Sequence, residues 1–339
     1  MSDNATPQFG NLVLDRSLSD LGQFCDCARA VIVTDANVRR LYGHDWPVER
    51  IVEVGVGEVS KSLATVEVLY RQFAEWQLDR QSWVIGVGGG VVCDLTGFAA
   101  ATYLRGLRFG FVPTTLLAQV DAAHGGKNGV NFGSYKNQIG TIVQPRFVLC
   151  DPRFISTLSE KELRNGLAEI IKHALIADAD YFHYLIDHCD DLLALREEVV
   201  RETIRQSIHI KMQYVTADVD ENGPRKILNF GHTLGHAWEA ARGFSHGEAV
   251  AMGMMAATAV SRKLGMLSAD DEARIVGLLR RAGFTSPSGE LIEEIRPALY
   301  KDKKRRQETL DFVLLNGIGR AVVQSLTIAE LEALLHDLR

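Results

Sequence analysis

The sequence predicts an α/β fold, in which a domain with an open, mostly parallel sheet precedes a largely α-helical domain. Short β-branched runs alternate with helical patterns in the first half, which is typical of a parallel sheet with crossover helices. From about Thr157, long amphipathic helical patterns replace the strand-like runs. Because the 339 residues also exceed most single domains, we expect two domains, at residues 1–156 and 157–339.

The first half is interpreted as an open nucleotide-binding α/β domain. Its predicted strands are the β-branched runs at residues 30–34, 50–54, 83–87 and 109–112. Between the second and third runs, apolar residues recur every three or four positions from Ser60 to Trp76. This period predicts an amphipathic helix with its apolar face toward the sheet.

The second half contains helical patterns at residues 160–177, 181–195, 197–215 and 247–264. A late apolar patch, residues 309–315, predicts a strand. Residues 328–338 predict a closing helix, for which Thr327 is the expected N-cap.

Composition and charge exclude several classes of protein. A formal charge of −6 with scattered Lys and Arg gives no surface for wrapping a nucleic-acid backbone. The N-terminus lacks a signal pattern and no apolar run is long enough to cross a bilayer, so no membrane is expected and the predicted location is cytoplasmic. The five cysteines have no paired CxxC spacing, and we expect them to be reduced and mostly buried.

A glycine-rich turn, Gly88-Gly89-Gly90, joins the third predicted strand to the next helix. Such a turn lets a diphosphate approach the free N–H groups of the helix. The GxGxxG spacing fails because Val91 occupies the last position, so a plain tight turn is equally open. Asp35, Glu58 and Lys61 follow strands, where open sheets bind ligands, although each could be a helix cap or a surface charge.

The segment 121–137 places Asp121, His124, Lys127, Lys136 and Asn137 among glycines. It is expected to be mostly loop. Two lysines and no acidic residue after Asp121 suit an anionic small molecule, and the alternative is a solvated basic loop.

Histidines and one glutamate suggest a metal site. His232 and His236 are four apart, on one side of a predicted helix, and His246 follows ten residues later. With Glu169, His232 and His246 could form a catalytic zinc site that keeps a position open for substrate. Locally hydrogen-bonded histidines remain an equal alternative, and Glu169 with Lys172 is by default a surface ion pair.

The densest charge run is Lys301–Arg306. It is typical of a solvated turn before a strand. A substrate phosphate would also favour such a cluster, so this run is a second-rank candidate site.

These pieces, in this order, resemble the 3-dehydroquinate synthase family of the wider sugar phosphate cyclase group. The resemblance spans about Thr34 to Gly319 and is carried by the motifs GGGVVCDLTGF, YLRG, PTTLLAQVD, GGKNGVN, KNQIG, AEIIKH, NFGHTLGH, SHGEAVAMGM and DKK. It implies a NAD-binding α/β domain at residues 1–156 and a helical zinc- and substrate-binding domain at residues 157–339, with Co²⁺ as a possible substitute metal.

The resemblance also implies roles for individual residues. The cofactor-binding residues would be Asp35, Asn37, Glu58, Lys61, Gly89, Gly90, Val91, Asp94, Thr114, Thr115, Asp121, Lys136 and Thr157. The zinc ligands would be Glu169, His232 and His246. His236 would handle protons, and the substrate would contact Lys127, Asn137, Lys172, Lys211, Arg225, Asn229 and one lysine of the DKK run, Lys303 rather than Lys304. Arg105 would reach the phosphate from a neighbouring subunit, which implies a homodimer.

The implied reaction converts 3-deoxy-D-arabino-heptulosonate 7-phosphate, a small anionic sugar phosphate, to 3-dehydroquinate and phosphate in the shikimate pathway. It combines transient oxidation by NAD, phosphate elimination, re-reduction and aldol closure, so the enzyme would be a lyase. The sequence departs from the family pattern at Ala123-His124 and Asn128, where Ser-Val and Thr are usual. The alternatives are another sugar phosphate cyclase, a polyol or glycerol-phosphate dehydrogenase, or a non-catalytic nucleotide-binding protein.

Overall fold

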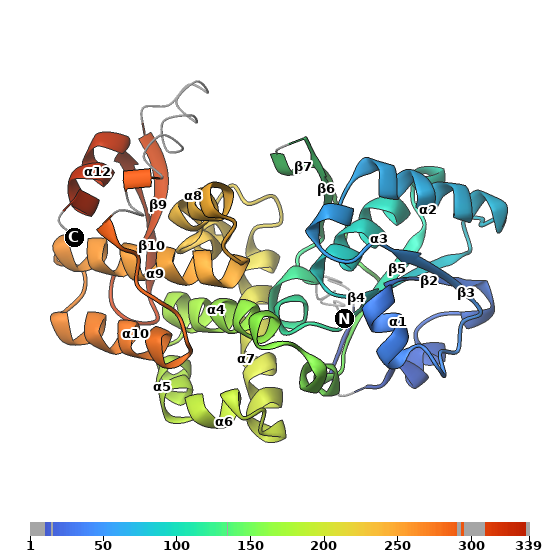
Figure 1. The fold of residues 1–339 in the computed structure, drawn as a ribbon, viewed down its shortest axis with the longest axis horizontal. Helices are drawn as coiled ribbons and strands as arrows, with labels where there is room; N and C mark the ends of the chain where they lie inside the picture. The colour runs from blue at the N-terminus through green and yellow to red at the C-terminus, as the bar shows by residue number, and fades with distance from the viewer. Residues whose placement is uncertain (1–10, 15, 134, 290–292, 295–308, 337–339) are drawn as a thin grey trace, which may run out of the picture. The chain divides into compact units, whose positions relative to one another are not determined.

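The chain forms two compact units, residues 1–158 and 159–339, in a computed structural model (Figure 1). The structure describes residues 11–14, 16–133, 135–289, 293–294 and 309–336. Within these ranges the fold class predicted from the sequence is confirmed: a parallel sheet with helices in the first unit and a mostly helical second unit. No helix of the described residues is long and apolar enough to span a membrane.

The sheet of the first unit has six strands, all paired in parallel, in the order β1-β8-β5-β4-β2-β3. Their bounds are β1 Asn11–Leu14, β2 Ala30–Asp35, β3 Arg50–Val54, β4 Trp83–Gly88, β5 Arg108–Pro113 and β8 Phe147–Cys150. The helices are α1 Ala36–Tyr42, α2 Leu63–Glu75 and α3 Gly90–Thr102. Because all the strands are parallel, their carboxyl ends share one edge of the sheet, where ligands of open α/β folds bind.

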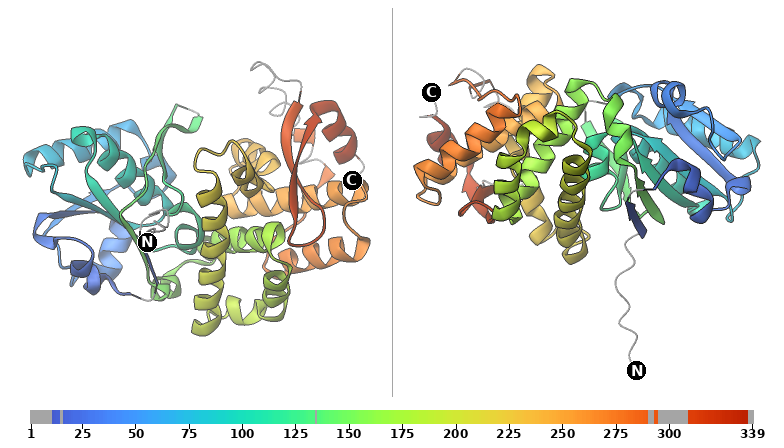
Figure 2. Two further views of the ribbon diagram at one scale, coloured as in Figure 1. Left: turned by 180° about the vertical axis from the view of Figure 1, so that it is seen from behind. Right: turned by 90° about the horizontal axis from the view of Figure 1, so that it is seen from below.

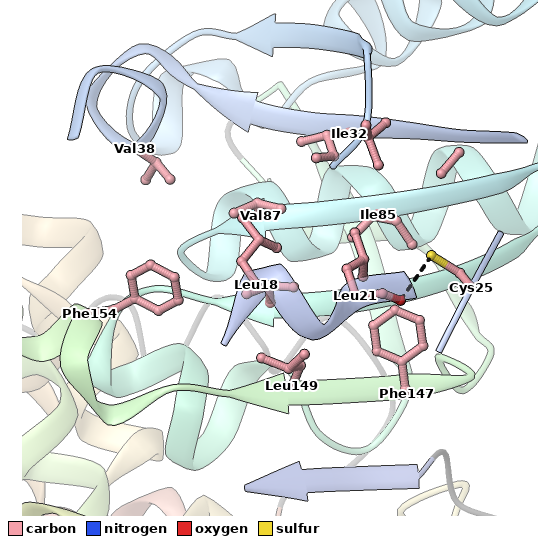
Figure 3. Packing of buried hydrophobic residues seen from close by; sticks show 13 residues of the cluster. Leu18, Leu21, Cys25, Ile32, Val38, Ile85, Val87, Phe147, Leu149 and Phe154 are labelled. Atoms are coloured by element: carbon pink, nitrogen blue, oxygen red, sulfur yellow. Dashed lines mark hydrogen bonds between the residues drawn. The ribbon is translucent and has the colours of Figure 1, made fainter. Parts of the chain in front are cut away.

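Helices and a short 3₁₀ helix cover both faces of the sheet. Helices α2 and α3 lie on one face (Figure 1). On the other face, Leu18 and Leu21 of the 3₁₀ helix Leu18–Gln23 pack on Ile32, Ile85 and Phe147 (Figure 3). The central strands are therefore buried on both sides, which explains their continuous apolar sequence.

The segment 121–137 was expected to be mostly loop, and this expectation is wrong. Strands β6 Lys127–Phe132 and β7 Tyr135–Ile142 form an antiparallel hairpin. The side chains of β7 are largely exposed, so the hairpin carries polar residues and glycines in place of an apolar run. Asn128 is buried and donates hydrogen bonds to the carbonyls of Gly126 (2.8 Å) and Val143 (2.9 Å), which fastens the start of the hairpin.

The second unit packs helices around α4 and α9 and adds an antiparallel pair of strands beside the last helix (Figure 2). The helices are α4 Glu160–Ala177, α5 Ala179–Asp187, α6 Cys189–Leu193, α7 Glu197–Ala217, α8 His232–Arg242, α9 His246–Lys263, α10 Ala269–Arg281 and α12 Ile328–His336; the strands are β9 Thr309–Leu315 and β10 Ala321–Thr327. Thr327 Oγ1 accepts the N–H of Glu330, as expected of the N-cap of α12.

One helix was predicted over residues 181–195, and the structure has two, α5 and α6. They are separated at His188. Arg281 of α10 donates hydrogen bonds to the carbonyl of Ile186 in α5 (2.8 Å) and to the carboxylate of Asp190 in α6. These two residues lie on opposite sides of the break. These contacts stabilise an interruption that apolar periodicity alone could not reveal. All five cysteines are free, and four of them are buried, as expected.

Candidate functional site

Three candidate metal ligands of the second unit converge from three helices. Glu169 lies in the middle of α4, whereas His232 and His246 are the first residues of α8 and α9. Nε2 of His246 is 3.2 Å from Oε1 of Glu169, and Nε2 of His232 is 3.5 Å from the same oxygen. One ligand atom from each residue lies within 4.8 Å of the others.

Glycines allow the backbones of the segments that carry these ligands to pack directly against one another. A Cβ at Gly253 of α9 would lie 1.9 Å from the carbonyl oxygen of Gly231, which directly precedes His232. A Cβ at Gly247 would lie 2.6 Å from the Cα of Asn165 on α4. The Asn165 carboxamide also accepts the N–H of Gly247 (2.9 Å), so the start of α9 is fastened to α4 one turn before Glu169.

The electrostatic surroundings prepare His232 to bind a cation. Its Nδ1 is 3.2 Å from the Phe230 carbonyl, which accepts a hydrogen bond from the Nδ1–H and leaves the Nε2 lone pair facing Glu169. Burial, and then the Lys172 ammonium, lowers the pKa of His232 to about 3. His232 is therefore neutral at physiological pH, which is the form that binds metals.

His246 and Lys172 both interact with Glu169. Burial opposes protonation of His246, but its hydrogen bonds to Glu169 and Glu239 outweigh burial and raise its pKa to about 9. Lys172 pairs with Glu169 in the interior, where both side chains are almost fully buried. The expectation of a surface ion pair is wrong, because this face of α4 packs against the protein core.

The donor set fits a catalytic divalent metal. Two imidazole nitrogens and one carboxylate oxygen are the three protein ligands typical of zinc sites that keep a fourth position for substrate. A second group, His236, Glu239 and His246, also places its ligand atoms within 4.8 Å of one another, with His236 exposed. The geometry therefore offers two groups that share His246.

Zinc binding should release about one proton near pH 7.5, because the metal must displace the proton that His246 holds below its pKa of about 9. His232, with a pKa of about 3, contributes none. The apparent affinity should thus rise roughly tenfold per pH unit below about pH 9. Calorimetric titration in two buffers of different ionisation enthalpy measures the proton count, and identical heats in both would contradict the prediction.

The Asp218 side chain holds together the segment between α7 and α8 through hydrogen bonds to the backbone. Sequence reasoning missed this residue. Its carboxylate accepts the N–H groups of Asn222 (3.1 Å), Gly223 (2.7 Å) and Arg225 (3.1 Å), which closes the turn. The turn places Glu221 where its Oε1 accepts a hydrogen bond from Nδ2 of Asn229 (2.6 Å). The only sequence signal for this role is an Asp seven residues before Arg225.

An open pocket of about 380 Å³ adjoins this turn. Its lining residues are Asp220, Glu221, Lys226, Asn229, Asp311, Val313 and Val323. Polar groups of both charges line most of it, which suits a polar ligand.

In the first unit, the turn Gly88-Gly89-Gly90 joins β4 to α3 at the carboxyl edge of the sheet. Gly89 is the N-cap of α3 and has no side chain to occupy the helix N–H groups. A Cβ at Gly89 would come within 3.0 Å of Thr115 Cγ2, so the turn packs closely against Thr115, which follows β5, and leaves little room for a side chain. The arrangement fits a diphosphate at the start of a helix.

The buried Lys61 is the centre of a polar cluster whose other members are half-buried or exposed. Its Nζ is 2.5 Å from the carboxylate of Asp94 and 2.5 Å from Oδ1 of Asn137. Burial raises the pKa of Asp94 to about 6 although the Lys61 charge opposes the shift. Asn131, missed by sequence reasoning, donates to Glu58 (2.8 Å) and accepts the N–H of Asn137 (2.9 Å), which joins the hairpin to this cluster.

The expected cofactor residues follow the strands that end at one edge of the sheet, or belong to the hairpin. Asp35 and Asn37 follow β2; Glu58 and Lys61 follow β3; Gly89, Gly90, Val91 and Asp94 follow β4; Thr114, Thr115 and Asp121 follow β5; Thr157 follows β8; and Lys136 is on β7. Asp35 caps α1 by accepting the N–H groups of Asn37 and Val38, as the simpler interpretation expected. Thr157 shares a 2.5 Å hydrogen bond with the Tyr42 hydroxyl.

The expected substrate residues are divided between the units. Lys127 and Asn137 lie on the hairpin and Arg105 on a turn after α3; Lys172, Lys211, Arg225, Asn229 and His236 lie in the second unit. Lys303 and Lys304 lie outside the described residues.

Comparisons with known proteins agree over nearly the whole chain. Residues 51–165 match the family described as 3-dehydroquinate synthase N-terminal, and residues 166–305 match 3-dehydroquinate synthase C-terminal. The 3-dehydroquinate synthase of Dichelobacter nodosus is 41% identical over 337 residues, which cover 96% of this chain and 91% of that protein.

Two solved structures extend the similarity to the fold. One is 2-epi-5-epi-valiolone synthase from Streptomyces hygroscopicus subsp. jinggangensis with NAD⁺ and Zn²⁺ bound, at 30% identity and a TM-score of 0.87 over 100% of this chain and 99% of that chain. The other is 2-deoxy-scyllo-inosose synthase complexed with carbaglucose-6-phosphate, NAD⁺ and Co²⁺, at 25% identity and a TM-score of 0.81 over 97% and 96%.

Proposed function

This chain belongs to the 3-dehydroquinate synthase family, and on that basis we propose that it converts 3-deoxy-D-arabino-heptulosonate 7-phosphate to 3-dehydroquinate and phosphate. The observation that carries the proposal is the convergence of Glu169, His232 and His246, with an acidic and imidazole donor set suited to a catalytic metal. The net reaction eliminates phosphate and closes a ring, so the enzyme is a lyase that depends on NAD and a divalent metal.

When bound, NAD would supply and recover a hydride, and Zn²⁺ or Co²⁺ would polarise substrate oxygens. Glu169, His232 and His246 would hold the metal. His236, exposed next to them, would move a proton to or from the substrate. The Glu169 carboxylate orients Lys172, which would donate a hydrogen bond to a substrate oxygen.

The cationic residues would bind the two anionic groups of the substrate. Lys127, Lys211, Arg225 and Lys303 would neutralise its carboxylate and phosphate. The Asn229 carboxamide, fixed by Glu221, would contact a hydroxyl, because the neighbouring carboxylate disfavours an anion. At the NAD site, the glycine turn would receive the diphosphate, and Lys61 with Asp94 would fix the walls around it.

Replacing Lys61 with Met should weaken NAD binding and lower the free energy of unfolding by about 2 kcal/mol, because the Asp94 carboxyl loses its partner in a largely buried position. The double variant Lys61→Met/Asp94→Leu should regain most of the stability and none of the NAD affinity. Denaturant unfolding and NAD titration measure the two effects. Wild-type NAD affinity in both variants would remove Lys61 from the cofactor site.

We also propose a homodimer in which Arg105 reaches the phosphate bound to the neighbouring subunit. Leu104, Arg105 and Gly106 have consecutive φ values of 50°, 64° and 121°, and the side chains of Leu104 and Arg105 are exposed. Left-handed backbone at two residues with side chains costs free energy and is found mainly at functional sites. The strained turn supports a role for Arg105 in binding.

Mixing two inactive variants tests the shared site. Arg105→Ala and His236→Ala should each be nearly inactive alone, and a refolded mixture should recover up to about one quarter of wild-type activity. Hybrid dimers then hold one site with an intact His236 and an Arg105 from the partner. No recovery in dimers shown to exchange subunits would place Arg105 in its own subunit's site or outside any site.

The decisive experiment on the reaction supplies purified protein with zinc, catalytic NAD and the heptulosonate phosphate. We expect phosphate and 3-dehydroquinate in equal amounts, no net NADH, and loss of turnover with a chelator. Net accumulation of NADH would indicate a polyol or glycerol-phosphate dehydrogenase. Turnover of a different sugar phosphate alone would indicate another cyclase. Cell fractionation tests the further proposal that the enzyme acts in the cytoplasm.

A further inference from the structure

A single turn of π-helix, Ala118–Ala122, connects β5 to the start of the β6–β7 hairpin. The N–H of Ala123 reaches back five residues to the carbonyl of Ala118 (3.1 Å). The next bond of this pattern would join the N–H of His124 to the carbonyl of Gln119. The His124 N–H bonds to Asp121 instead (3.0 Å), and Nε2 of the His124 ring lies 2.7 Å from the Gln119 oxygen. The ring thus replaces the backbone donor that the π-turn lacks.

The ring is held against a fixed point of the sheet. His124 is 6% exposed, and because a carbonyl can only accept, its Nε2 carries the proton in this contact. The Gln119 side chain donates to the carbonyls of Pro113 at the end of β5 (3.1 Å) and Asp151 after β8 (2.8 Å). Gln119, and through it His124, is therefore tied to the carboxyl ends of two neighbouring strands.

Only two residues separate His124 from Lys127, the first residue of β6. Both are glycines with left-handed backbone, Gly125 at φ 101° and Gly126 at φ 69°. The Gly126 carbonyl accepts the N–H of Val143 (2.9 Å), which starts the hairpin pairing. Because the link has only two residues and its second carbonyl is hydrogen-bonded to Val143, a shift of His124 would also move the start of β6 at Lys127.

We infer that His124 is a positioning residue that sets the place of Lys127 by closing the π-turn with its side chain. His124 acts through the backbone and does not itself exchange a proton with the substrate. The inference relies on the proposed function only for the statement that Lys127 binds the anionic substrate.

Three variants test the inference. His124→Val removes the ring donor, His124→Gln keeps an N–H donor at a similar reach, and His44→Val removes an exposed histidine of the same unit as a matched control. Amide hydrogen exchange over residues 118–143 needs no substrate. We expect faster exchange there in His124→Val, near wild-type exchange in His124→Gln and in the control, and no change in β2 and β4 of any variant.

Kinetics give the second readout. His124→Val should lower kcat/KM for the sugar phosphate about tenfold, mainly through KM, with unchanged NAD affinity and unchanged ionisations in the pH profile. His124→Gln should recover most of the loss.

Three results would overturn the inference. Wild-type exchange and KM in His124→Val would make His124 a space filler. Loss of one ionisation from the pH profile, with wild-type exchange, would make it a proton-transfer residue. Failure of His124→Gln to restore wild-type exchange would show that a side-chain N–H donor to the Gln119 carbonyl is not what holds the π-turn. If no variant turns over the sugar phosphate and neither does the wild type, the proposed function fails, and the exchange data still decide the role of His124.

Discussion

Replacing His232 with Ala should strip the protein of its metal, whereas replacing His236 with Ala should leave the metal bound and lower the rate. His232 faces the buried Glu169 oxygen from 3.5 Å and is held neutral with its Nε2 directed there. Loss of a direct ligand should weaken zinc binding by more than the roughly 10–100-fold typical of losing a partner outside the coordination shell. His236 is exposed, and loss of a general acid or base costs about 10²- to 10⁴-fold in rate.

Metal content after dialysis and competition with a chromogenic chelator measure both variants. The two candidate groups of ligands share His246 and differ in their other two members. The first contains Glu169 and His232, and the second contains His236 and Glu239, so each variant removes a ligand from one group only. If His236→Ala lost the metal and His232→Ala kept it, the second group would be the metal centre. Equal loss in both would remove the division of roles between the two histidines.

Strands with continuous apolar sequence could be predicted from the sequence, and polar strands could not. The strands at residues 50–54 and 309–315 match their predicted bounds residue by residue, because each is a β-branched or apolar run bounded by polar residues. The hairpin β6–β7 was missed, since the side chains of β7 are largely exposed and the buried residues of β6 include Asn128 and Gly129, so neither strand shows an alternation of apolar and polar residues. Four-residue strands such as β1 and β8 are too short for periodicity to identify.

Spacing offered a zinc site of Glu169, His232 and His246 only as one of two equal alternatives, and the resemblance was needed to choose it and to separate His236 from the ligands. Glu169, His232 and His246 belong to three helices whose close approach depends in part on glycine contacts, and such contacts have no period in the sequence. Sequence spacing correctly placed Glu169 and Lys172 on one helix face, but it could not tell a buried face from an exposed one. Asp218 and Asn131 act through backbone and side-chain amides, which no motif marks.

Replacing Gly253 with Ala should therefore disable the metal site from a position that never touches the metal. The new Cβ would lie 1.9 Å from the Gly231 carbonyl oxygen, and the atoms that it would meet all belong to the backbone, so no side chain can move aside. Helix α9 must shift away from Gly231, which directly precedes His232. Because α9 begins with His246, this shift separates His246 from His232. We expect the free energy of unfolding of the metal-free protein to fall by about 3 kcal/mol or more, and zinc affinity to fall with it.

A matched glycine-to-alanine change separates this effect from helix propensity. Gly277 lies in α10, and a Cβ there would meet nothing within 4 Å. Gly277→Ala should raise stability by roughly 0.5–1 kcal/mol, because alanine loses less backbone entropy in a helix. Denaturant unfolding with a chelator present, followed by zinc titration, measures both variants. A lower free energy of unfolding in Gly253→Ala and a higher one in Gly277→Ala would show that the contact of α9 with Gly231, and not helix propensity, decides the first effect. A parallel loss of zinc affinity in Gly253→Ala would link this contact to the positions of His232 and His246. Equal stability gains in both would mean that α9 can move without cost, and the glycine contact would then have no part in building the site.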